Sequence, residues 1–145
     1  MKIAPFLLTF AKAAVWAAAA LAWPGFCQEA VKEPFDVGVT YERTLHVSTG
    51  GSPTGDGSLE APFDSIRTAV RHITPGTRVL VQPGTYTRAT NLSGLQGEAG
   101  KPIAIVASGE VVLDAAGAST VVQGSDLKYV VIEGFTLRGA STHAI

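Results

Sequence analysis

The sequence has one cysteine among its 145 residues and few charged side chains, and both shortages limit what the protein can be. Because Cys27 has no partner cysteine, no intrachain disulfide can form and no cysteine-based metal site can be built. The 11 Lys and Arg residues do not outnumber the 12 Asp and Glu residues. We therefore expect neither a nucleic-acid-binding face nor a polybasic membrane patch.

Glycine, threonine, serine and valine are frequent, whereas charged residues make up only 16% of the chain. Such a composition favours short strands joined by tight turns over a helical bundle. A chain of this length has room for one domain. The composition therefore predicts a single all-β domain.

Residues 1–27 have the order of a secretory signal peptide. Lys2 and Lys12 supply the basic start, an uncharged apolar run occupies 13–22, and Trp23-Pro24-Gly25 follows. Lys12 keeps the uncharged stretch well below the ~20 residues that span a bilayer, so no stable membrane span is expected. We predict export, either to the periplasm or to the medium.

Two cleavage positions fit this signal. Cleavage after Cys27 places the small residues Gly25 and Cys27 before the cut, and cleavage after Ala22 places two alanines there. A lipoprotein signal is a third alternative, although Phe26 is bulky where a small residue normally precedes the lipidated cysteine.

Residues 28–44 are polar and mixed in charge, and we interpret them as a linker or N-terminal arm. The folded domain is predicted to span 45–145, beginning with a short strand at 45–47. The following segment, 48–58, is rich in Gly and Ser and is predicted to be an irregular surface loop. Calcium binding there is disfavoured, because only Asp56 and Glu60 offer carboxylates and the alternating ligands of an EF-hand are absent.

A short amphipathic helix is predicted at 65–73. Its apolar residues are spaced i, i+3, i+4 and i+7, Asp64 or Ser65 can cap its first turn, and Pro75-Gly76 ends it. The stripe consists of Ile66, Ala69, Val70 and Ile73. We expect this helix to cover the open first edge of the sheet, with Arg67, Arg71 and His72 forming a solvated face.

From Arg78 onward the apolar period changes to 2, and short apolar runs are separated by glycine-bearing turns. Pairs at Val79/Val81, Ile103/Ile105 and Val130/Ile132 recur at intervals of 24 and 27 residues, whereas Gly84, Gly109 and Gly134 are each 25 apart. We expect the turns to absorb this disagreement, because a one-residue slip within a strand exchanges its faces. Smaller apolar pieces lie at 111–113, 121–122 and 135–137.

This repeat predicts a right-handed parallel β-helix. A short strand with one buried face cannot stand alone, but coils stacked about 4.8 Å apart pair the backbone groups of each coil with those of its neighbours. The spacing of a leucine-rich repeat is absent, and antiparallel sandwiches do not repeat at this interval. Each coil would contribute two or three strands.

Three strings carry a resemblance to a known family: 45–48 with the Gly/Asp loop, 61–66, and Pro75-Gly76-Thr77-Arg78-Val79-Leu80-Val81-Gln82-Pro83-Gly84-Thr85-Tyr86. Together they resemble the opening of pectate lyase-like β-helix proteins. The continuation at 100–105 and 129–135 is similar to the first coils of chondroitinase B and alginate lyases. The resemblance extends from about Leu45 to the last residue.

The resemblance implies a secreted or periplasmic protein whose partner is an acidic polysaccharide. It also implies β-elimination, in which a base removes the proton α to a uronate carboxylate while calcium or a cationic side chain neutralises that carboxylate. In the family a lysine or arginine usually serves as base, on coils well beyond the second or third. We therefore expect an N-terminal fragment of a longer enzyme that is inactive by itself.

Within the chain, Lys128 and Arg138 are the predicted substrate-binding residues, as holders of substrate carboxylates. No catalytic residue and no metal or calcium site is assigned, because no cluster of converging ligands is evident in the sequence. Two other functions stay open: a non-catalytic β-helix for adhesion or carbohydrate binding, and a glycoside hydrolase with paired carboxylates on later coils. Sequence beyond Ile145 would separate these alternatives.

Overall fold

The computed structural model describes residues 39–143 and 145, so the predicted signal peptide and most of the predicted arm lie outside the described residues. Seven strands and one short helix follow one another along this part of the chain. In order they are β1 (Arg43–Ser52), α1 (Ile66–Val70), β2 (Thr77–Val81), β3 (Gly84–Tyr86), β4 (Thr90–Asn91), β5 (Ile103–Asp114), β6 (Val122–Gln123) and β7 (Val130–Arg138).

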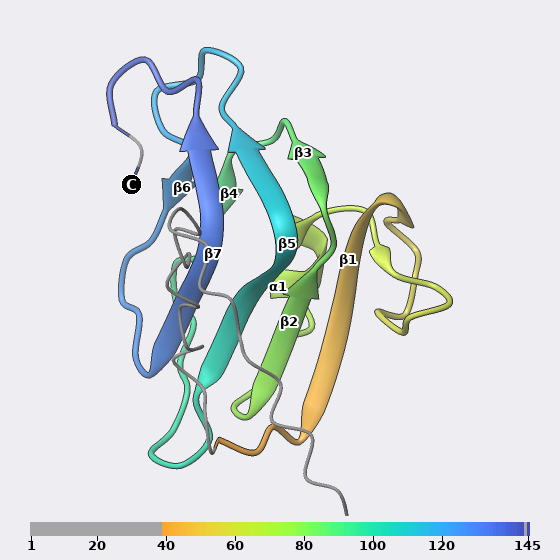
Figure 1. Cartoon of the computed structure of the whole chain (residues 1–145). Coiled ribbons are helices and arrows are strands. Elements are labelled where there is room, and N and C mark those ends of the chain that lie inside the picture. The colour runs from red at the N-terminus through yellow and green to blue at the C-terminus, as the bar shows by residue number, and fades with distance from the viewer. Residues whose placement is uncertain (1–38, 144) are drawn as a thin grey trace, which may run out of the picture. The chain divides into compact units, whose positions relative to one another are not determined.

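Strands β1, β2, β5 and β7 lie side by side in one curled sheet (Figure 1). Every strand pair in it is parallel, and β3 joins the same sheet by pairing with the second half of β5. Strands β4 and β6 form a second parallel pair. The predicted right-handed parallel β-helix is confirmed, with coils that return in the same direction.

The predicted repeat is confirmed for the last two coils and wrong for the first two. Ile103 pairs with Val130, the predicted interval of 27. Val79, however, pairs with Ile105 rather than with Ile103, an interval of 26 instead of 24. The error is two residues, and because side chains alternate with a period of two, the predicted inward face is still the buried one.

The glycine register is also corrected by the structure. Gly84 pairs with Val111, not with Gly109. The register between β5 and β7 shifts between Val106 and Val111, so the extra residues form a bulge inside the strand rather than lengthening a turn. Gly109 and Gly134 lie at this bulge with φ of 108° and 85°, values that side-chain-bearing residues rarely adopt.

Strand β1 is longer than predicted, because it begins at Arg43 and continues to Ser52 through residues expected to be loop. Contacts from the following segment explain the extension. The N–H of His46 donates to the carbonyl of Gly57 (2.8 Å), and the N–H of Ser52 donates to that of Pro62 (3.0 Å). Tertiary pairing here overrides the low strand preference of Gly and Ser. The loop of residues 53–63 thus covers the edge of β1 that faces away from β2.

The helix is shorter than predicted, at five residues, with Ser65 as its N-cap. After Val70 the backbone hydrogen bonds join residues three positions apart, as in a 3₁₀ turn. An example is the bond from the His72 N–H to the Ala69 carbonyl (2.9 Å). Ile66 and Ala69 are buried as predicted. The helix contacts β1 and β4, and its role as the cap of the first coil stays a prediction.

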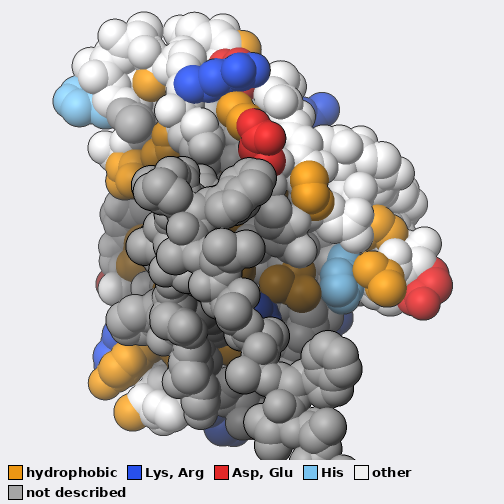
Figure 2. Space-filling model, in the orientation of Figure 1, with side chains coloured by type: hydrophobic (Ala, Val, Ile, Leu, Met, Phe, Trp, Pro, Cys, Tyr) orange, Lys and Arg blue, Asp and Glu red, His pale blue; other side chains and the backbone are white. Residues whose placement is uncertain are grey.

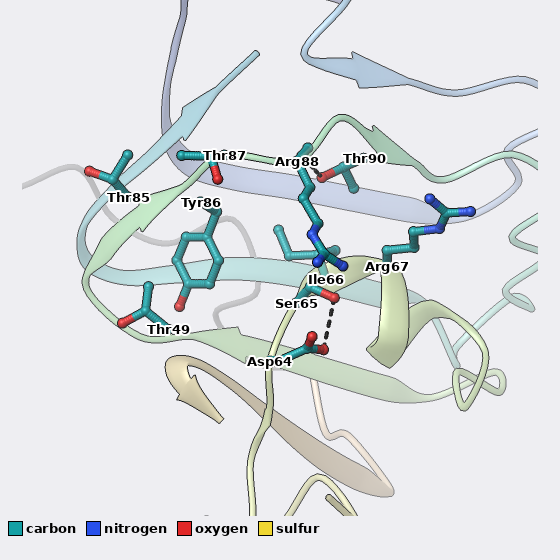
Figure 3. Close-up of a pocket in the computed structure, with 10 residues that line it drawn as sticks. All are labelled: Thr49, Asp64, Ser65, Ile66, Arg67, Thr85, Tyr86, Thr87, Arg88 and Thr90. Atoms are coloured by element: carbon teal, nitrogen blue, oxygen red, sulfur yellow. Dashed lines mark hydrogen bonds between the residues drawn. The ribbon is translucent and has the colours of Figure 1, made fainter. Parts of the chain in front are cut away.

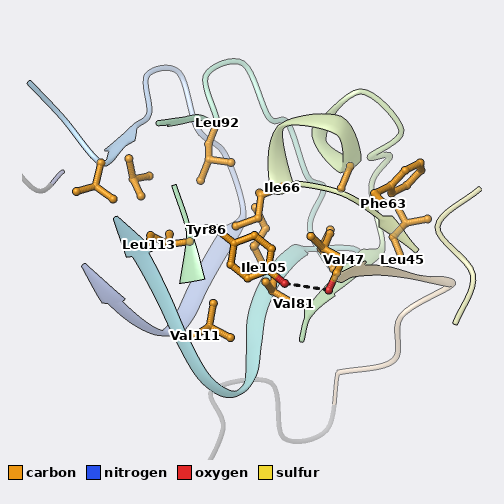
Figure 4. Close-up of a cluster of buried hydrophobic side chains, with 14 of the residues drawn as sticks. Leu45, Val47, Phe63, Ile66, Val81, Tyr86, Leu92, Ile105, Val111 and Leu113 are labelled. Carbon is orange, nitrogen blue, oxygen red and sulfur yellow. Dashed lines mark hydrogen bonds between the residues drawn. The ribbon is translucent and has the colours of Figure 1, made fainter. Parts of the chain in front are cut away.

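Apolar side chains from successive coils fill the interior (Figure 4). The alternation is clear in β2, where Val79 and Val81 are buried while Leu80 between them is partly exposed. Each aliphatic side chain removed from water in this way contributes about 1.5–3 kcal/mol. The buried set includes Leu45, Val47, Phe63, Ile66, Val81, Tyr86, Leu92, Ile105, Val111 and Leu113. Among the described residues, no helix has the length and apolarity needed to cross a membrane.

Adjacent glycines in β1 provide a test of the covered edge. A Cβ on Gly51 would fall on the backbone carbonyls of Phe63 and Pro62, whereas a Cβ on Gly50 would meet nothing within 4 Å. We expect Gly51→Ala to lower the free energy of unfolding by about 1–3 kcal/mol through forced displacement of this loop. The matched variant Gly50→Ala should change it by less than about 0.5 kcal/mol. Urea denaturation measures both, and equal effects would contradict the proposed edge contact.

Candidate functional site

The two residues predicted to hold substrate carboxylates lie at opposite ends of β7. Lys128 precedes the strand, with its ammonium 5.7 Å from the centre of the Tyr129 ring. Arg138 is the last residue of the strand, and its Nε lies 2.9 Å from Asp114 Oδ2. A nine-residue strand spans roughly 25–30 Å at about 3.3 Å per residue. The structure therefore does not bring the two cations together, and their role in binding stays a prediction.

A hollow of about 230 Å³ lies where the start of α1 meets the segment after β3 (Figure 3). We call it the corner hollow. Its lining combines two guanidinium groups, one carboxylate and several hydroxyls: Thr49, Asp64, Ser65, Ile66, Arg67, Thr85, Tyr86, Thr87, Arg88 and Thr90. The hollow thus combines charged and hydroxyl-bearing residues with the apolar surfaces of Ile66 and the Tyr86 ring.

Tyr86 fixes the β3 side of the hollow. Its ring is buried, and its hydroxyl donates to the carbonyl of Gln82 at 2.9 Å. Burial raises the pKa of this phenol above its ordinary value of 10.0, so it stays protonated at neutral pH. Because side chains alternate along an extended chain, the exposed Thr85 and Thr87 point to the opposite side from Tyr86.

Asp64 and Ser65 fix the helix side of the hollow. The Asp64 carboxylate accepts hydrogen bonds from the hydroxyls of Thr68 (2.7 Å) and Ser65 (3.0 Å). The bond from Thr68 is the largest cause that holds the pKa of Asp64 below its ordinary value of 3.8, and the nearby positive charge of Arg88 lowers it further. Asp64 is therefore ionised at neutral pH and engaged by its own helix turn.

The guanidinium groups of Arg67 and Arg88 are exposed at the rim. In Figure 3 the Arg88 side chain extends toward Ser65, while the Arg67 side chain points away from Asp64. Within the described part of the chain, neither group has a carboxylate within 4.0 Å, in contrast to Arg138 and Lys101. In the space-filling view of Figure 2, by comparison, a basic side chain near the top of the molecule lies directly beside acidic ones.

These groups suit binding rather than proton abstraction. A guanidinium stays protonated in proteins unless strongly perturbed, Asp64 is ionised and engaged in hydrogen bonds, and the Tyr86 hydroxyl is a donor within the fold. No three His, Cys, Asp or Glu side chains in the described ranges gather closely enough to hold a metal ion.

Sequence reasoning missed this site. Arg67 was interpreted as part of a solvated helix face, and Arg88 carried no signal in a linear pattern. Arg67 and Arg88 are 21 positions apart in the sequence, and only the return of the chain through β2 and β3 places them on one hollow. The one available clue was the run of Thr85, Thr87 and Arg88 around Tyr86 directly after the Pro83-Gly84 turn.

Comparison with known proteins supports the same fold class. A solved rhamnogalacturonan lyase superposes with a TM-score of 0.53 at 23% identity, over 66% of this chain and 28% of that chain. The pectate lyase Pel9A superposes with a TM-score of 0.51 at 26% identity, over 68% of this chain and 28% of that chain. The chain therefore has a pectate lyase-like β-helix fold, as its sequence resemblance implied.

A relative is also found at the level of sequence. The uncharacterized protein YwoF of Bacillus subtilis (strain 168) is 30% identical over 105 residues, which cover 67% of this chain and 22% of that protein. No family model matches the chain. The chain thus spans about a fifth of YwoF and little more than a quarter of each of the two lyases.

The hydrogen bonds to Asp64 predict a pH-dependent contribution to stability. Since its folded pKa lies below the unfolded value of about 3.8, the contribution is fully present above pH 3.8 and is lost as pH falls through the folded pKa. We expect Asp64→Asn to reduce the free energy of unfolding by about 0.5–1.5 kcal/mol at pH 7. The difference from wild type should shrink below pH 3.8.

Urea denaturation from pH 7 to pH 2 tests this, with the exposed Glu110→Gln as the charge-matched control. A difference that stays constant down to pH 2 would show that Asp64 is not stabilised in its ionised form.

Arg138 and Asp114 allow a second titration test. The pKa of Asp114 is lowered first by the N–H of Ala116, which donates to Oδ1 at 2.8 Å, and then by Arg138. We expect Arg138→Gln to raise this pKa only part of the way toward 3.8, because the backbone hydrogen bond remains. Carbon-detected NMR titration of the Asp114 carboxyl measures it, and Lys128→Gln should leave it unchanged. A full return to 3.8 would contradict the dominance of the backbone bond.

Proposed function

We propose that this chain is the N-terminal portion of an exported polysaccharide lyase-like protein that acts on acidic, uronate-containing polysaccharide by β-elimination. The observation that carries the proposal is the β-helix fold shared with a rhamnogalacturonan lyase and with Pel9A. The sequence of residues 1–27, with its basic start and apolar centre, supports export to the periplasm or the medium.

The reacting groups are proposed to lie on coils that this sequence does not contain. Support comes from coverage, because the chain corresponds to 28% of each of the two lyases. β-Elimination needs a base for the proton α to the uronate carboxylate and a positive charge to stabilise the anion that forms. The lining of the corner hollow offers exposed cations at Arg67 and Arg88 but no free base. We therefore assign the first coils to substrate binding rather than to chemistry.

A non-catalytic carbohydrate-binding protein is the second candidate, and the same hollow favours it. A β-helix whose cations hold anionic sugars without a base would retain the polysaccharide unchanged. Fold alone does not separate the two, since function depends on sites and not on architecture.

The proposal is tested by incubating the purified 145-residue chain and the longest protein encoded by its gene with pectate, alginate and chondroitin sulfate. Elimination creates an unsaturated uronate that absorbs in the ultraviolet. We expect the longer protein to form this product from at least one substrate and the 145-residue chain to form none.

Three results would contradict this expectation. Turnover by the short chain would place the base among its own residues. New reducing ends without ultraviolet absorbance would indicate a hydrolase. Retention of polysaccharide by the longer protein without any product would favour the non-catalytic candidate.

A further inference from the structure

We infer that Arg67, Arg71 and Arg88 form a subsite for the carboxylates of two neighbouring uronate units, on the outside of the first coil. The inference rests on the proposed function and deepens it, because it names the residues of this chain that contact the substrate. It begins from a second hollow next to the corner hollow.

The second hollow has a volume of about 460 Å³ and shares Arg67 with the corner hollow. Its lining consists of residues from the end of α1 and from the segment around β4: Arg67, Val70, Arg71, Ala89, Asn91 and Ser93. The two hollows therefore meet at Arg67. We call these two adjoining hollows, which lie between α1 and residues 85–93, the arginine groove.

The charge of the arginine groove is positive although the chain as a whole carries a formal net charge of -1. Three guanidinium groups line it, and the one carboxylate in either lining is Asp64. Asp64 already accepts two hydroxyl hydrogen bonds from its own helix turn. In the described part of the chain, no carboxylate lies within ion-pair distance of Arg67, Arg71 or Arg88.

The guanidinium group matches the ligand in shape as well as in charge. Its planar fork can donate two parallel hydrogen bonds to a carboxylate, and such charge-assisted bonds are about twice as strong as neutral ones. Because Arg88 lines one hollow, Arg71 lines the other and Arg67 lines both, carboxylates on successive sugar units can meet different guanidinium groups.

Neutral polar residues that line the groove beside the cations fit the rest of a sugar. Thr85 and Thr87 are exposed residues in the lining of the corner hollow. Asn91 accepts the N–H of Ser93 through its Oδ1 at 2.8 Å, which leaves its NH2 group to donate outward. A single-stranded nucleic acid would instead need exposed aromatic platforms, and the one aromatic residue of the groove, Tyr86, is buried. The chemistry of the groove thus favours an acidic oligosaccharide.

The test measures binding of trigalacturonate and of its methyl ester to the purified full chain by calorimetry. The ester has the same sugar ring without the charge. We expect trigalacturonate to bind at least roughly tenfold more tightly than the ester, because each lost charge-assisted hydrogen bond costs about that factor. Arg67→Gln/Arg88→Gln should remove this difference, and Arg71→Gln should reduce it.

Two matched variants control for charge and for folding. Arg43→Gln/Lys101→Gln removes two exposed cations outside the groove and should leave the affinity unchanged. Arg67→Lys/Arg88→Lys keeps the charge but loses the planar fork, and should bind with intermediate affinity. Amide chemical-shift changes at Thr87 and Asn91 on titration with trigalacturonate would locate the ligand in wild type.

The inference is overturned by equal affinity for acid and ester, by equal losses in the groove and control variants, or by shift changes confined to Lys128 and Arg138. Binding of a sulfated oligosaccharide but not of trigalacturonate would overturn the assignment to carboxylates. None of these measurements requires catalytic turnover. Failure of the longer protein to form unsaturated product would therefore refute the proposed chemistry while leaving the groove in place.

Discussion

The parallel stacking of successive coils is the constraint on which every other feature depends. The backbone of β5 is paired on one side with β2 and β3 and on the other with β7, so no strand in the middle of the stack exists independently of its neighbours. Since each coil returns in the same direction, side chains of one face align along the stack and bury one another. The surface outside the sheet is then free to vary from coil to coil, and the arginine groove lies on that surface.

Much of the fold could be predicted because its signals are local and periodic. Alternating apolar pairs, turns with glycine, and one short helical stripe were sufficient to indicate parallel coils. The register between the first coils was not predictable, because pairing Val79 with Ile105 or with Ile103 buries the same face. The bulge between Val106 and Val111 was not predictable either, because the extra residues of a longer coil can be accommodated in a turn or in a strand. The length of β1 could not be predicted for another reason. The strand is extended by hydrogen bonds and bridges from residues 57–63, which lie beyond the strand in the sequence.

The candidate site was much less predictable than the fold. Lys128 and Arg138 are both cations near the end of the sequence, but closeness in sequence does not bring two side chains together when each coil carries side chains around its circumference. Arg138 is already paired with Asp114. Arg67 and Arg88, by contrast, come from different sides of the first coil, and their common hollow results from the path of the chain between them. A binding site of this kind depends on how the chain coils in space, so no short stretch of sequence can reveal it.

The loop over β1 also has a consequence for how such molecules associate. An uncovered strand edge offers backbone donors and acceptors to any other extended chain, and sheet proteins avoid this because it leads to aggregation. Here the carbonyls of Gly57 and Pro62 occupy donors of β1 that a foreign strand would need. The stack consequently has a polarity: sheet growth is blocked at β1, and any lengthening by added strands must proceed from the side of β7.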